Sequence, residues 1–541
     1  MLADEPSTAE AIATSLVAAG VRTVFVYPGD PTIELMERAR QLGVDVVLAR
    51  REGTAAFMAE AQAMASGRVG VCISTLGPGS TALLNGVAAA TLDRVPMLAI
   101  SGQIETARQA VFTHQVVDQG QLYAPVTKWA GRVEASAVGP IMRKALRTAT
   151  AERPGAVHLT CASDTFKAPA APDRAPLPPL GQPSSGTVTV YRASGSDADP
   201  QQLLERAHRP LLLAGIAATR CAAGPALERL AEVVGMPVVV APMAKGLVPE
   251  SSPWFAGVLD MACNTTVWDL LAGADLIIAA GFDPVELIKP WQLSVPVLHV
   301  DTTANTDQVY PSEIEVVGDV SAIAEWLADG FTGEPRWSTA EVANFRRRLL
   351  DDYYAGRVAG KLNPTDVVDQ VRASCPQSTI ATTDVGSHKL LVGQGWVTYE
   401  ARTMLMTNGL SAMGFGLPGA ISAKLTYPDR PVVALVGDGG FAMTATELRL
   451  ASARHLGIVV VVFVDGSLNR IELKQVAMGY PSTATRIEDI DLVAMAGSMA
   501  CDGVRVESVQ DLEKALVSVE GLSRPLVVEA RIDPAQYESQ F

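Results

Sequence analysis

The chain has 541 residues, of which 48% are hydrophobic and 19% are charged, a composition that permits large buried cores and excludes a wholly disordered protein. Its formal net charge of −15 argues against a nucleic acid or an anionic membrane as the main partner. A prior of about 150 residues per domain predicts three or four domains. The six cysteines lie far apart, and the first residues have the spacing of an amphipathic helix rather than of a leader. These features predict a cytoplasmic protein.

Short apolar, β-branched runs alternate with Ala- and Leu-rich stretches along the whole chain, which predicts repeated strand–helix units. Because these runs are apolar throughout, we expect parallel sheets covered by helices on both faces, that is, doubly wound α/β domains. The predicted strands are Thr23–Val26, Val69–Ser74, Met97–Ile100, Pro210–Ala214, Val238–Ala241, Ala274–Ala280, Val432–Val436 and Ile458–Val464.

Two changes in composition divide the chain into three predicted domains. Residues 167–183 contain six prolines and no helical period, so we expect an extended linker there. A helical stretch of mixed charge at 340–359 ends shortly before Leu362-Asn363-Pro364, where a new unit begins. The expected domains are therefore residues 1–170, 190–335 and 360–535.

The residues with the clearest chemical meaning follow two predicted strands in the third domain. A GDGG sequence at 437–440 follows the first strand, and Asp465-Gly466-Ser467 follows the second, so that Asp438 and Asp465 are 27 residues apart. If the strands are parallel neighbours, both carboxylates lie at the ligand-binding edge of the sheet, where glycines let a phosphate approach the backbone. Carboxylates at such an edge suit Mg²⁺ bound to a diphosphate. The alternative is a tight turn with a helix-capping aspartate, followed by an unrelated hairpin.

This pair of motifs resembles the metal-binding motif of the thiamine diphosphate enzymes of the acetolactate synthase and 2-oxo acid decarboxylase superfamily. The resemblance extends over essentially the whole chain, and in motif it is greatest to the FAD-independent, catabolic-type acetolactate synthases. The family's pyrimidine-binding, central and diphosphate-binding domains follow one another in the order of the three predicted domains. The resemblance implies thiamine diphosphate and Mg²⁺ as cofactors, with the metal bound by Asp438, Asp465 and the Ser467 carbonyl.

In the first domain, Glu52 lies where the family has its catalytic glutamate. The resemblance implies that its carboxyl group faces N1′ of the pyrimidine ring, and burial there would raise its pKa and help it to keep its proton. A glutamate that merely interacts with a helix dipole is the alternative. Residues 75–85 resemble the family's glycine-proline loop that leads a helix under the cofactor, and we also expect Ser80 to cap that helix.

Two further segments of the first domain match places where the family contacts substrate. Tyr27-Pro28-Gly29 corresponds to a loop near the reacting carbon, but Asp30 follows it where acetolactate synthases usually have a small residue, and its carboxylate would disfavour an anionic acceptor. Residues 111–118 match the catabolic type, which implies that His114 and Gln115 orient the substrate carbonyl and stabilise its developing oxyanion. The alternative is that His114 bonds to a local backbone group.

In the third domain, residues 385–388 correspond to a diphosphate-binding turn, and residues 408–416 to the segment that bends the cofactor. The resemblance implies that Met413 separates the two cofactor rings and that the Ser411 carbonyl accepts from the 4′-amino group. An ordinary glycine-rich turn is the alternative. The predicted cofactor-binding residues are Tyr27, Pro28, Gly29, Glu52, Val385, Gly386, Ser387, His388, Ser411, Met413, Gly437, Asp438, Gly439, Gly440, Asp465, Gly466 and Ser467.

The central domain carries the weakest signals. Ala214-Gly215-Ile216 resembles a degenerate dinucleotide turn without GxGxxG, and residues 281–286 lack the arginine expected of FAD-binding relatives, so we expect a structural domain without FAD. Residues 257–260 contain no arginine to hold the carboxylate of a second 2-oxo acid.

The resemblance implies decarboxylation of a 2-oxo acid, pyruvate, and carboligation of the resulting enamine to a second 2-oxo acid, as in acetolactate synthases. Three alternatives remain: a decarboxylase that releases an aldehyde, a carboligase with another aldehyde or ketone acceptor, and a non-catalytic relative that binds thiamine diphosphate. The family places its active sites between subunits, which implies a homodimer or a homotetramer. No nucleic acid or membrane partner is expected.

Overall fold

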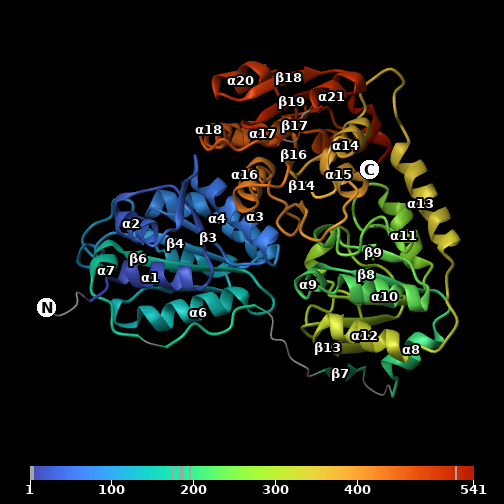
Figure 1. Cartoon of the computed structure of the whole chain (residues 1–541), viewed down its shortest axis with the longest axis horizontal. Helices are drawn as coiled ribbons and strands as arrows, with labels where there is room; N and C mark the ends of the chain where they lie inside the picture. Colours follow the sequence, from blue (N-terminus) through green and yellow to red (C-terminus); the bar gives the residue numbers. More distant parts are fainter. Residues whose placement is uncertain are drawn as a thin grey trace. The chain divides into compact units, whose positions relative to one another are not determined.

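The computed structural model describes residues 5–173, 175–181, 188–193, 197–517, 519 and 521–540. The chain forms two compact units (Figure 1). Unit 1 comprises Met1–Gln182 and Leu410–Tyr427, and unit 2 comprises Pro183–Gly409 and Pro428–Phe541. Three positions of the predicted linker, 174, 182 and 183, lie outside the described residues.

Unit 1 is built on a six-stranded parallel sheet in the order β2-β1-β3-β4-β6-β5. In Figure 1, α1 and α6 cover one face of this sheet, and α3 and α4 cover the other. The strands are β1 (Thr23–Val26), β2 (Asp45–Leu48), β3 (Gly70–Ser74), β4 (Met97–Gln103), β5 (Trp129–Arg132) and β6 (Ala156–Ala162). The helices are α1 (Thr8–Ala18), α2 (Ile33–Gln41), α3 (Glu52–Ser66), α4 (Gly77–Leu92), α5 (Gln119–Tyr123), α6 (Val138–Thr150), α7 (Ser163–Lys167) and α16 (Gly416–Thr426).

The first sheet of unit 2 has seven strands in the order β10-β9-β8-β11-β12-β13-β7. It is parallel except for β7, which pairs antiparallel with β13 at one edge. The strands are β7 (Thr189–Arg192), β8 (Pro210–Ala214), β9 (Val238–Val240), β10 (Phe255–Val258), β11 (Leu276–Ala280), β12 (Val297–Asp301) and β13 (Ile314–Val317). The helices are α8 (Pro200–Arg206), α9 (Ile216–Arg220), α10 (Gly224–Val234), α11 (Asn264–Ala272), α12 (Val320–Gly330) and α13 (Thr339–Tyr354).

The second sheet of unit 2 is parallel and has six strands in the order β15-β14-β16-β17-β19-β18. Its central strands β16 and β17 are apolar and buried except at their last residues, as expected for a sheet covered on both faces. The strands are β14 (Ile380–Thr383), β15 (Met404–Leu405), β16 (Val432–Gly437), β17 (Val459–Val464), β18 (Asp502–Val506) and β19 (Leu526–Arg531). The helices are α14 (Pro364–Ala373), α15 (Ser387–Gly395), α17 (Asp438–Thr444), α18 (Leu448–Ala453), α19 (Asn469–Ala477), α20 (Leu492–Ser498) and α21 (Val509–Ala515).

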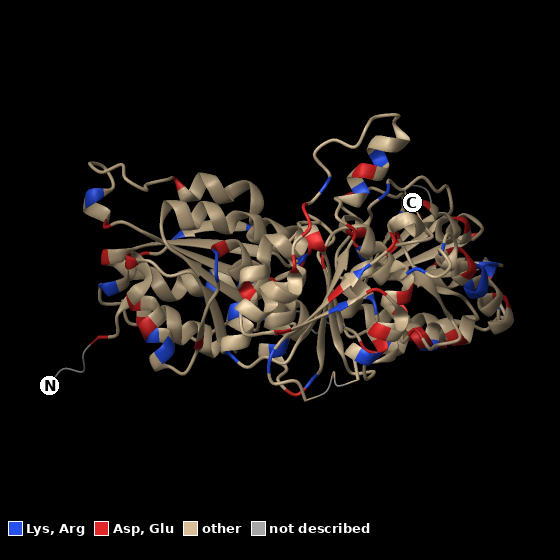
Figure 2. Ribbon diagram, turned by 90° about the horizontal axis from the view of Figure 1, so that it is seen from above, with Lys and Arg blue, Asp and Glu red and all other residues tan. Residues whose placement is uncertain are grey.

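The three α/β domains predicted from the sequence are therefore present, each with a largely parallel sheet. Acidic and basic residues are interspersed in both units (Figure 2). Within the described ranges, no helix has the length and apolar character needed to cross a membrane.

Candidate active site

The two aspartates singled out in the sequence lie close together in unit 2. Because β16 and β17 are parallel neighbours, Asp438 and Asp465 follow adjacent strand ends. The Asp438 carboxylate accepts hydrogen bonds from the backbone N–H of Gly466 (2.8 Å), Asp465 (3.3 Å) and Gly439 (2.8 Å). The structure contradicts both parts of the alternative: β16 and β17 are parallel and form no hairpin, and the cap of α17 is Gly437, while Asp438 is the first helical residue.

Burial and mutual repulsion disfavour negative charge on this pair of carboxylates. Burial raises the pKa of Asp438, and burial together with the charge of Asp438 raises the pKa of Asp465 to about 7. A divalent cation would offset both effects, and hard carboxylate oxygens are the ligands that Mg²⁺ prefers. No group of three or more His, Cys, Asp or Glu side chains that could hold a metal occurs in the described part of the chain. A site here would therefore complete its protein ligands with a backbone oxygen, as predicted for Ser467.

The loop that follows Asp465 is held by side-chain contacts. The Ser467 N–H donates to Asp465 Oδ1 (3.0 Å), and the Ser467 hydroxyl donates to the carboxylate of Glu472. Glu472 is also paired with Arg486, with an N–O distance of 2.6 Å. These contacts orient the loop that carries the Ser467 carbonyl.

His388 lies over two of the predicted glycines, at the start of α15. A Cβ atom on Gly386 would come within 2.8 Å of the His388 ring, and one on Gly437 within 3.0 Å, so the ring leaves little room for a side chain at either position. The ring also stacks on Phe463, with centroids 5.4 Å apart. Burial lowers its pKa to about 3, so the imidazole is neutral at physiological pH.

The Nε2 atom of His388 is buried and, within the part of the chain that the structure describes, has no hydrogen-bond partner. Buried polar atoms are normally paired, so this nitrogen is expected to meet a ligand or an ordered water. Together with the glycine-lined backbone of Gly386 and Gly437, it fits an oxygen-rich anion such as a diphosphate.

Three residues that the sequence did not single out support this site. The Ser387 hydroxyl donates to Asn469 Oδ1 (2.8 Å), which joins the first turns of α15 and α19. The Lys389 ammonium is buried and donates to the Thr407 carbonyl (2.7 Å) and to Asn408 Oδ1 (3.1 Å). A Cβ atom on Gly440 would come within 2.6 Å of the Asp384 carboxylate. Two features of the sequence could have pointed to these residues. Lys389 is the only charged residue in the otherwise largely apolar α15, and Asn469 is an amide shortly after Asp465.

In unit 1, three loops meet around the start of α3 and α4. Glu52 is half-buried, and its Oε1 atom lies 3.0 Å from where a Cβ on Gly79 would be. A Cβ on Gly29 would collide with the side chain of Thr75, and the Gly77 N–H donates to the Gln115 carbonyl (3.1 Å). The structure thus brings the predicted loops at 27–29, 75–79 and 114–115 together with the start of α3.

The structure also shows where α4 begins and how exposed His114 is. α4 begins at Gly77 with Leu76 as its cap, so the prediction that Ser80 caps the helix is wrong: Ser80 lies inside the helix with its hydroxyl buried. His114 is exposed in unit 1, and its ring makes an edge contact with Phe112 at 6.1 Å.

The segment that carries Ser411 and Met413 belongs to unit 1, where α16 packs along α3. The Ser422 hydroxyl donates to the Met58 carbonyl (2.6 Å). Ser411 has a φ of +52°, a conformation that non-glycine residues rarely adopt and that is common at functional sites. The half-buried Met413 therefore lies on a segment anchored to the helix that begins with Glu52.

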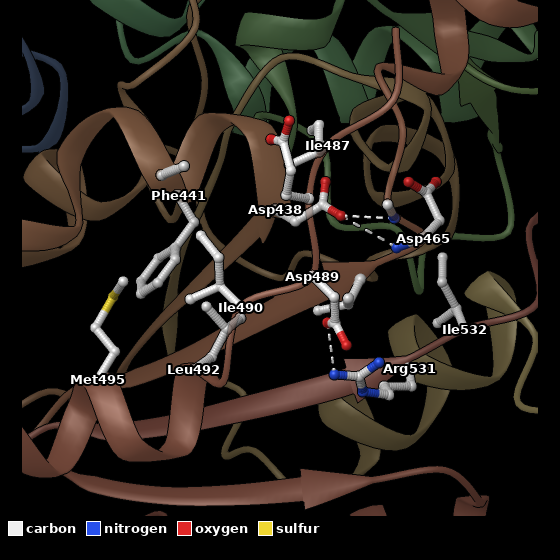
Figure 3. A pocket seen from close by; sticks show the side chains of 14 residues that line it. Asp438, Phe441, Asp465, Ile487, Asp489, Ile490, Leu492, Met495, Arg531 and Ile532 are labelled. Carbon is white, nitrogen blue, oxygen red and sulfur yellow. Dashed lines mark hydrogen bonds and ion pairs between the residues drawn. The ribbon is translucent and has the colours of Figure 1, made fainter.

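A pocket of about 360 Å³ borders the aspartate pair in unit 2. Figure 3 shows Asp438 bonded to the backbone of the loop at Asp465 on one side, and the Asp489–Arg531 ion pair (2.8 Å) on another. Apolar side chains, among them Phe441 and Met495, form the rest of its wall. The pocket leaves the carboxylate pair reachable from solvent.

Comparisons with known proteins match one family domain to each of the three sheets. Three family models match: the N-terminal TPP binding domain of thiamine pyrophosphate enzymes at residues 6–122, their central domain at 199–327, and their C-terminal TPP binding domain at 384–530. The chain is 30% identical to a catabolic acetolactate synthase of Raoultella terrigena, over 97% of this chain and 95% of the relative. It is 27% identical to an acetolactate synthase of Bacillus subtilis, over 97% and 93%. It is also 29% identical to a "Probable 2-ketoarginine decarboxylase" of Pseudomonas aeruginosa, over 96% and 93%.

Proposed function

Because the chain belongs to the thiamine pyrophosphate enzymes, in the superfamily of acetolactate synthases and 2-oxo acid decarboxylases, we propose that it decarboxylates pyruvate and joins the remaining acyl group to a second 2-oxo acid. It is an enzyme of the carboligase/lyase type that depends on thiamine diphosphate. The observation that carries the proposal is the half-buried pair of carboxylates beside a glycine-lined histidine, at the carboxyl ends of neighbouring parallel strands.

Thiamine diphosphate, when bound, supplies an electron sink for the negative charge left when carbon dioxide departs. Asp438, Asp465 and the Ser467 carbonyl would hold Mg²⁺. His388 and the backbone at Gly386 would hold the diphosphate. In unit 1, the Glu52 carboxyl group would hold or give up a proton toward the pyrimidine nitrogen, and His114 and Gln115 would bind the substrate carbonyl.

The competing function is release of an aldehyde without carboligation. It is supported by the relative named as a 2-ketoarginine decarboxylase, and by the exposed Asp30, whose carboxylate directly follows the loop at 27–29. A carboligase with an uncharged aldehyde or ketone acceptor is a third possibility on the same ground, since Asp30 would repel a carboxylate-bearing acceptor. A non-catalytic role is disfavoured because Glu52 is present.

The test is to incubate the protein with pyruvate, thiamine diphosphate and Mg²⁺ and to identify the products. The expected product is acetolactate. Release of acetaldehyde would establish a decarboxylase instead. If the protein released no carbon dioxide from any 2-oxo acid, both the carboligase and the decarboxylase would be refuted. Glu52→Gln should lower the rate at least about 100-fold, because general acid–base groups contribute about 10²- to 10⁴-fold. Glu34→Gln, which alters a surface carboxylate on α2, is the matched control. Full turnover by the Glu52 variant would show that its carboxyl group has no catalytic role.

Three further expectations accompany this function. The protein acts as a homodimer or homotetramer, which native mass spectrometry checks. The central domain binds no FAD, a proposal supported by Glu286, whose carboxyl group already accepts from the Ile216 N–H (2.9 Å) at the turn that resembles a dinucleotide site. The enzyme is cytoplasmic, which is supported by six cysteines, none of which forms a disulfide.

A further inference from the structure

A cluster of polar side chains is buried in unit 1, between its sheet and the helices α4 and α5. Ser74, Ser101 and His158 lie on the neighbouring strands β3, β4 and β6, and all three are fully buried. The Ser74 and Ser101 hydroxyl oxygens are 2.8 Å apart, and the Ser101 oxygen is 2.9 Å from Nε2 of His158. The His158 ring stacks on that of Tyr123, at the end of α5, with centroids 3.6 Å apart. Because a buried polar group costs stability unless it is hydrogen-bonded, the partners of these groups indicate what the cluster does.

The hydrogen bonds of the cluster run in one consistent direction. Burial lowers the pKa of His158 to about 3, so its ring is neutral and carries a single N–H. Its Nδ1 atom is buried and has no partner among the described residues, so we assign the proton to Nε2, which donates to Ser101. The Ser101 hydroxyl then donates to Ser74, and the Ser74 hydroxyl donates to the Thr75 carbonyl (3.2 Å). In the opposite direction, the buried N–H of His158 would have no acceptor among those residues. The chain of donors therefore ends on the segment that follows β3.

A second hydrogen bond holds the other end of that segment. The Tyr123 hydroxyl donates to the carbonyl of Ser80 (2.6 Å), which lies near the start of α4. Residues 75–80 are thus held at both ends by groups that meet at His158. Between these ends the segment contains two glycines, which leave a backbone more conformational freedom than other residues do. A segment of this composition needs such anchors if it is to keep one conformation.

The 75–80 segment contacts two parts of the predicted site in unit 1. A Cβ atom on Gly79 would lie 3.0 Å from Oε1 of Glu52, so the backbone of the segment packs directly against the Glu52 carboxyl group. The Gly77 N–H donates to the Gln115 carbonyl (3.1 Å). A displaced segment would therefore move the surroundings of both residues, and a misplacement of about 1 Å can cost about 100-fold in rate.

We propose that this buried cluster, with His158 at its centre, positions the 75–80 segment and, through it, the Glu52 carboxyl group. His158 is a positioning residue, because it acts on Glu52 only through other residues: two serines lie between its ring and the segment. The proposal rests on the proposed function, in which Glu52 is catalytic. It extends that function to side chains on β4 and β6 that belong to no motif of the sequence.

The test compares variants of the full chain that keep or remove single hydrogen bonds. His158→Gln and His158→Met introduce side chains of similar length, of which only Gln can donate an N–H to Ser101. Tyr123→Phe keeps the ring that stacks on His158 but cannot donate to the Ser80 carbonyl. Val157→Ala is the matched control for a general loss of stability, since Val157 is buried on the opposite face of the same strand.

Hydrogen exchange in the absence of cofactor is the first measurement. The amides of Gly77 and Ser80 form hydrogen bonds in the wild type, so they should exchange faster when the segment is loosened. Peptides that cover residues 75–80 should exchange at least about tenfold faster in His158→Met and in Tyr123→Phe than in the wild type or the control. The Gln variant at position 158 should exchange at a rate near that of the wild type.

The second measurement is kinetic and tests whether the cluster acts through Glu52. In active enzyme, His158→Met should lower kcat at least about tenfold with little change in KM, and His158→Gln should retain most of the wild-type kcat. Added to Glu52→Gln, His158→Met should cost less than about twofold more, because the effects of residues that act as a unit are not additive.

The outcomes separate the positioning role from the proposed function. Wild-type exchange rates or wild-type kcat in both His158→Met and Tyr123→Phe overturn the positioning role and leave the proposed function standing. A loss in the double variant that equals the product of the two single losses also overturns it. If the wild type releases no carbon dioxide from any 2-oxo acid, the proposed function fails, and hydrogen exchange alone decides whether the cluster holds the segment. Thermal unfolding identifies a misfolded His158→Met, in which case Tyr123→Phe decides.

Discussion

Replacing Glu286 with Gln should remove a large pH-dependent part of the stability of unit 2. Glu286 ends a 3-10 turn, Pro284–Glu286, and is fully buried. Its Oε2 atom accepts from the backbone N–H of Ile216 (2.9 Å) and Asp283 (3.3 Å), while Oε1 has no partner among the described residues. Burial is the main cause that raises the pKa of this carboxyl group to about 8.

The sign and size of the effect follow from linkage. The group keeps its proton in the folded protein up to about pH 8, whereas the unfolded chain loses it above its ordinary pKa of 4.5. The stabilisation is therefore complete below pH 4.5 and is lost as the pH rises to about 8. Each pH unit in that window costs about 1.4 kcal/mol, so between pH 5 and pH 8 the wild type should lose about 4 kcal/mol that the Gln variant does not.

The assay is thermal unfolding of the wild type, Glu286→Gln and the control Glu232→Gln, an exposed position on α10, at intervals from pH 5 to pH 8. Gln keeps an oxygen that accepts from Ile216, so the capping bond survives. Burial and the charge of Asp438 raise the pKa of Asp465 to about 7, so Asp465 contributes to the pH dependence of stability in the same window. Because this contribution is common to all three proteins, the melting temperatures of the variants are compared with that of the wild type at each pH. Melting temperatures of wild type and Glu286→Gln that change in parallel with pH would refute the reasoning.

Two further predictions concern the cofactor site and its support. Chelation of Mg²⁺ in the presence of thiamine diphosphate should lower the melting temperature, since a ligand at 100 times its Kd stabilises the folded protein by about 2.7 kcal/mol. In Asp438→Asn, the melting temperatures with and without chelator should be the same. An unchanged melting temperature on chelation would contradict the metal site. Lys389→Met keeps the volume of the buried side chain but leaves the Thr407 carbonyl and Asn408 Oδ1 without this donor, which should cost about 1 to 3 kcal/mol in unfolding experiments. Stability equal to that of the wild type would show that these bonds contribute little.

The buried strands were predictable from the sequence, because a short, continuous apolar run bounded by turn residues is typical of a strand that is buried on both faces of a sheet. The predicted runs Thr23–Val26 and Pro210–Ala214 coincide with β1 and β8. By contrast, β7 was missed: its residues are mostly exposed, and only its backbone pairing with β13 makes it a strand. Edge strands of this kind are determined by a distant partner rather than by their own pattern.

The same distinction holds for the candidate site. Asp438 and Asp465 could be paired from the sequence because each follows an apolar strand, and the structure brings them together, although their roles remain predictions. Lys389 and Asn469 could not be assigned from the sequence, because their roles depend on contacts with residues elsewhere in the chain. Helix starts were also uncertain: the backbone, rather than the hydroxyl of Ser80, determines where α4 begins.

The inclusion of residues 410–427 in unit 1 has a consequence for how the chain can be cut or recombined. The chain passes between the units three times, near residues 182, 409 and 427. A fragment that ends at residue 182 would lack α16 and would expose the side of α3 on which α16 packs. Chimaeras between relatives should therefore exchange the amino-terminal segment and residues 410–427 together, so that the two packed helices keep the same parent.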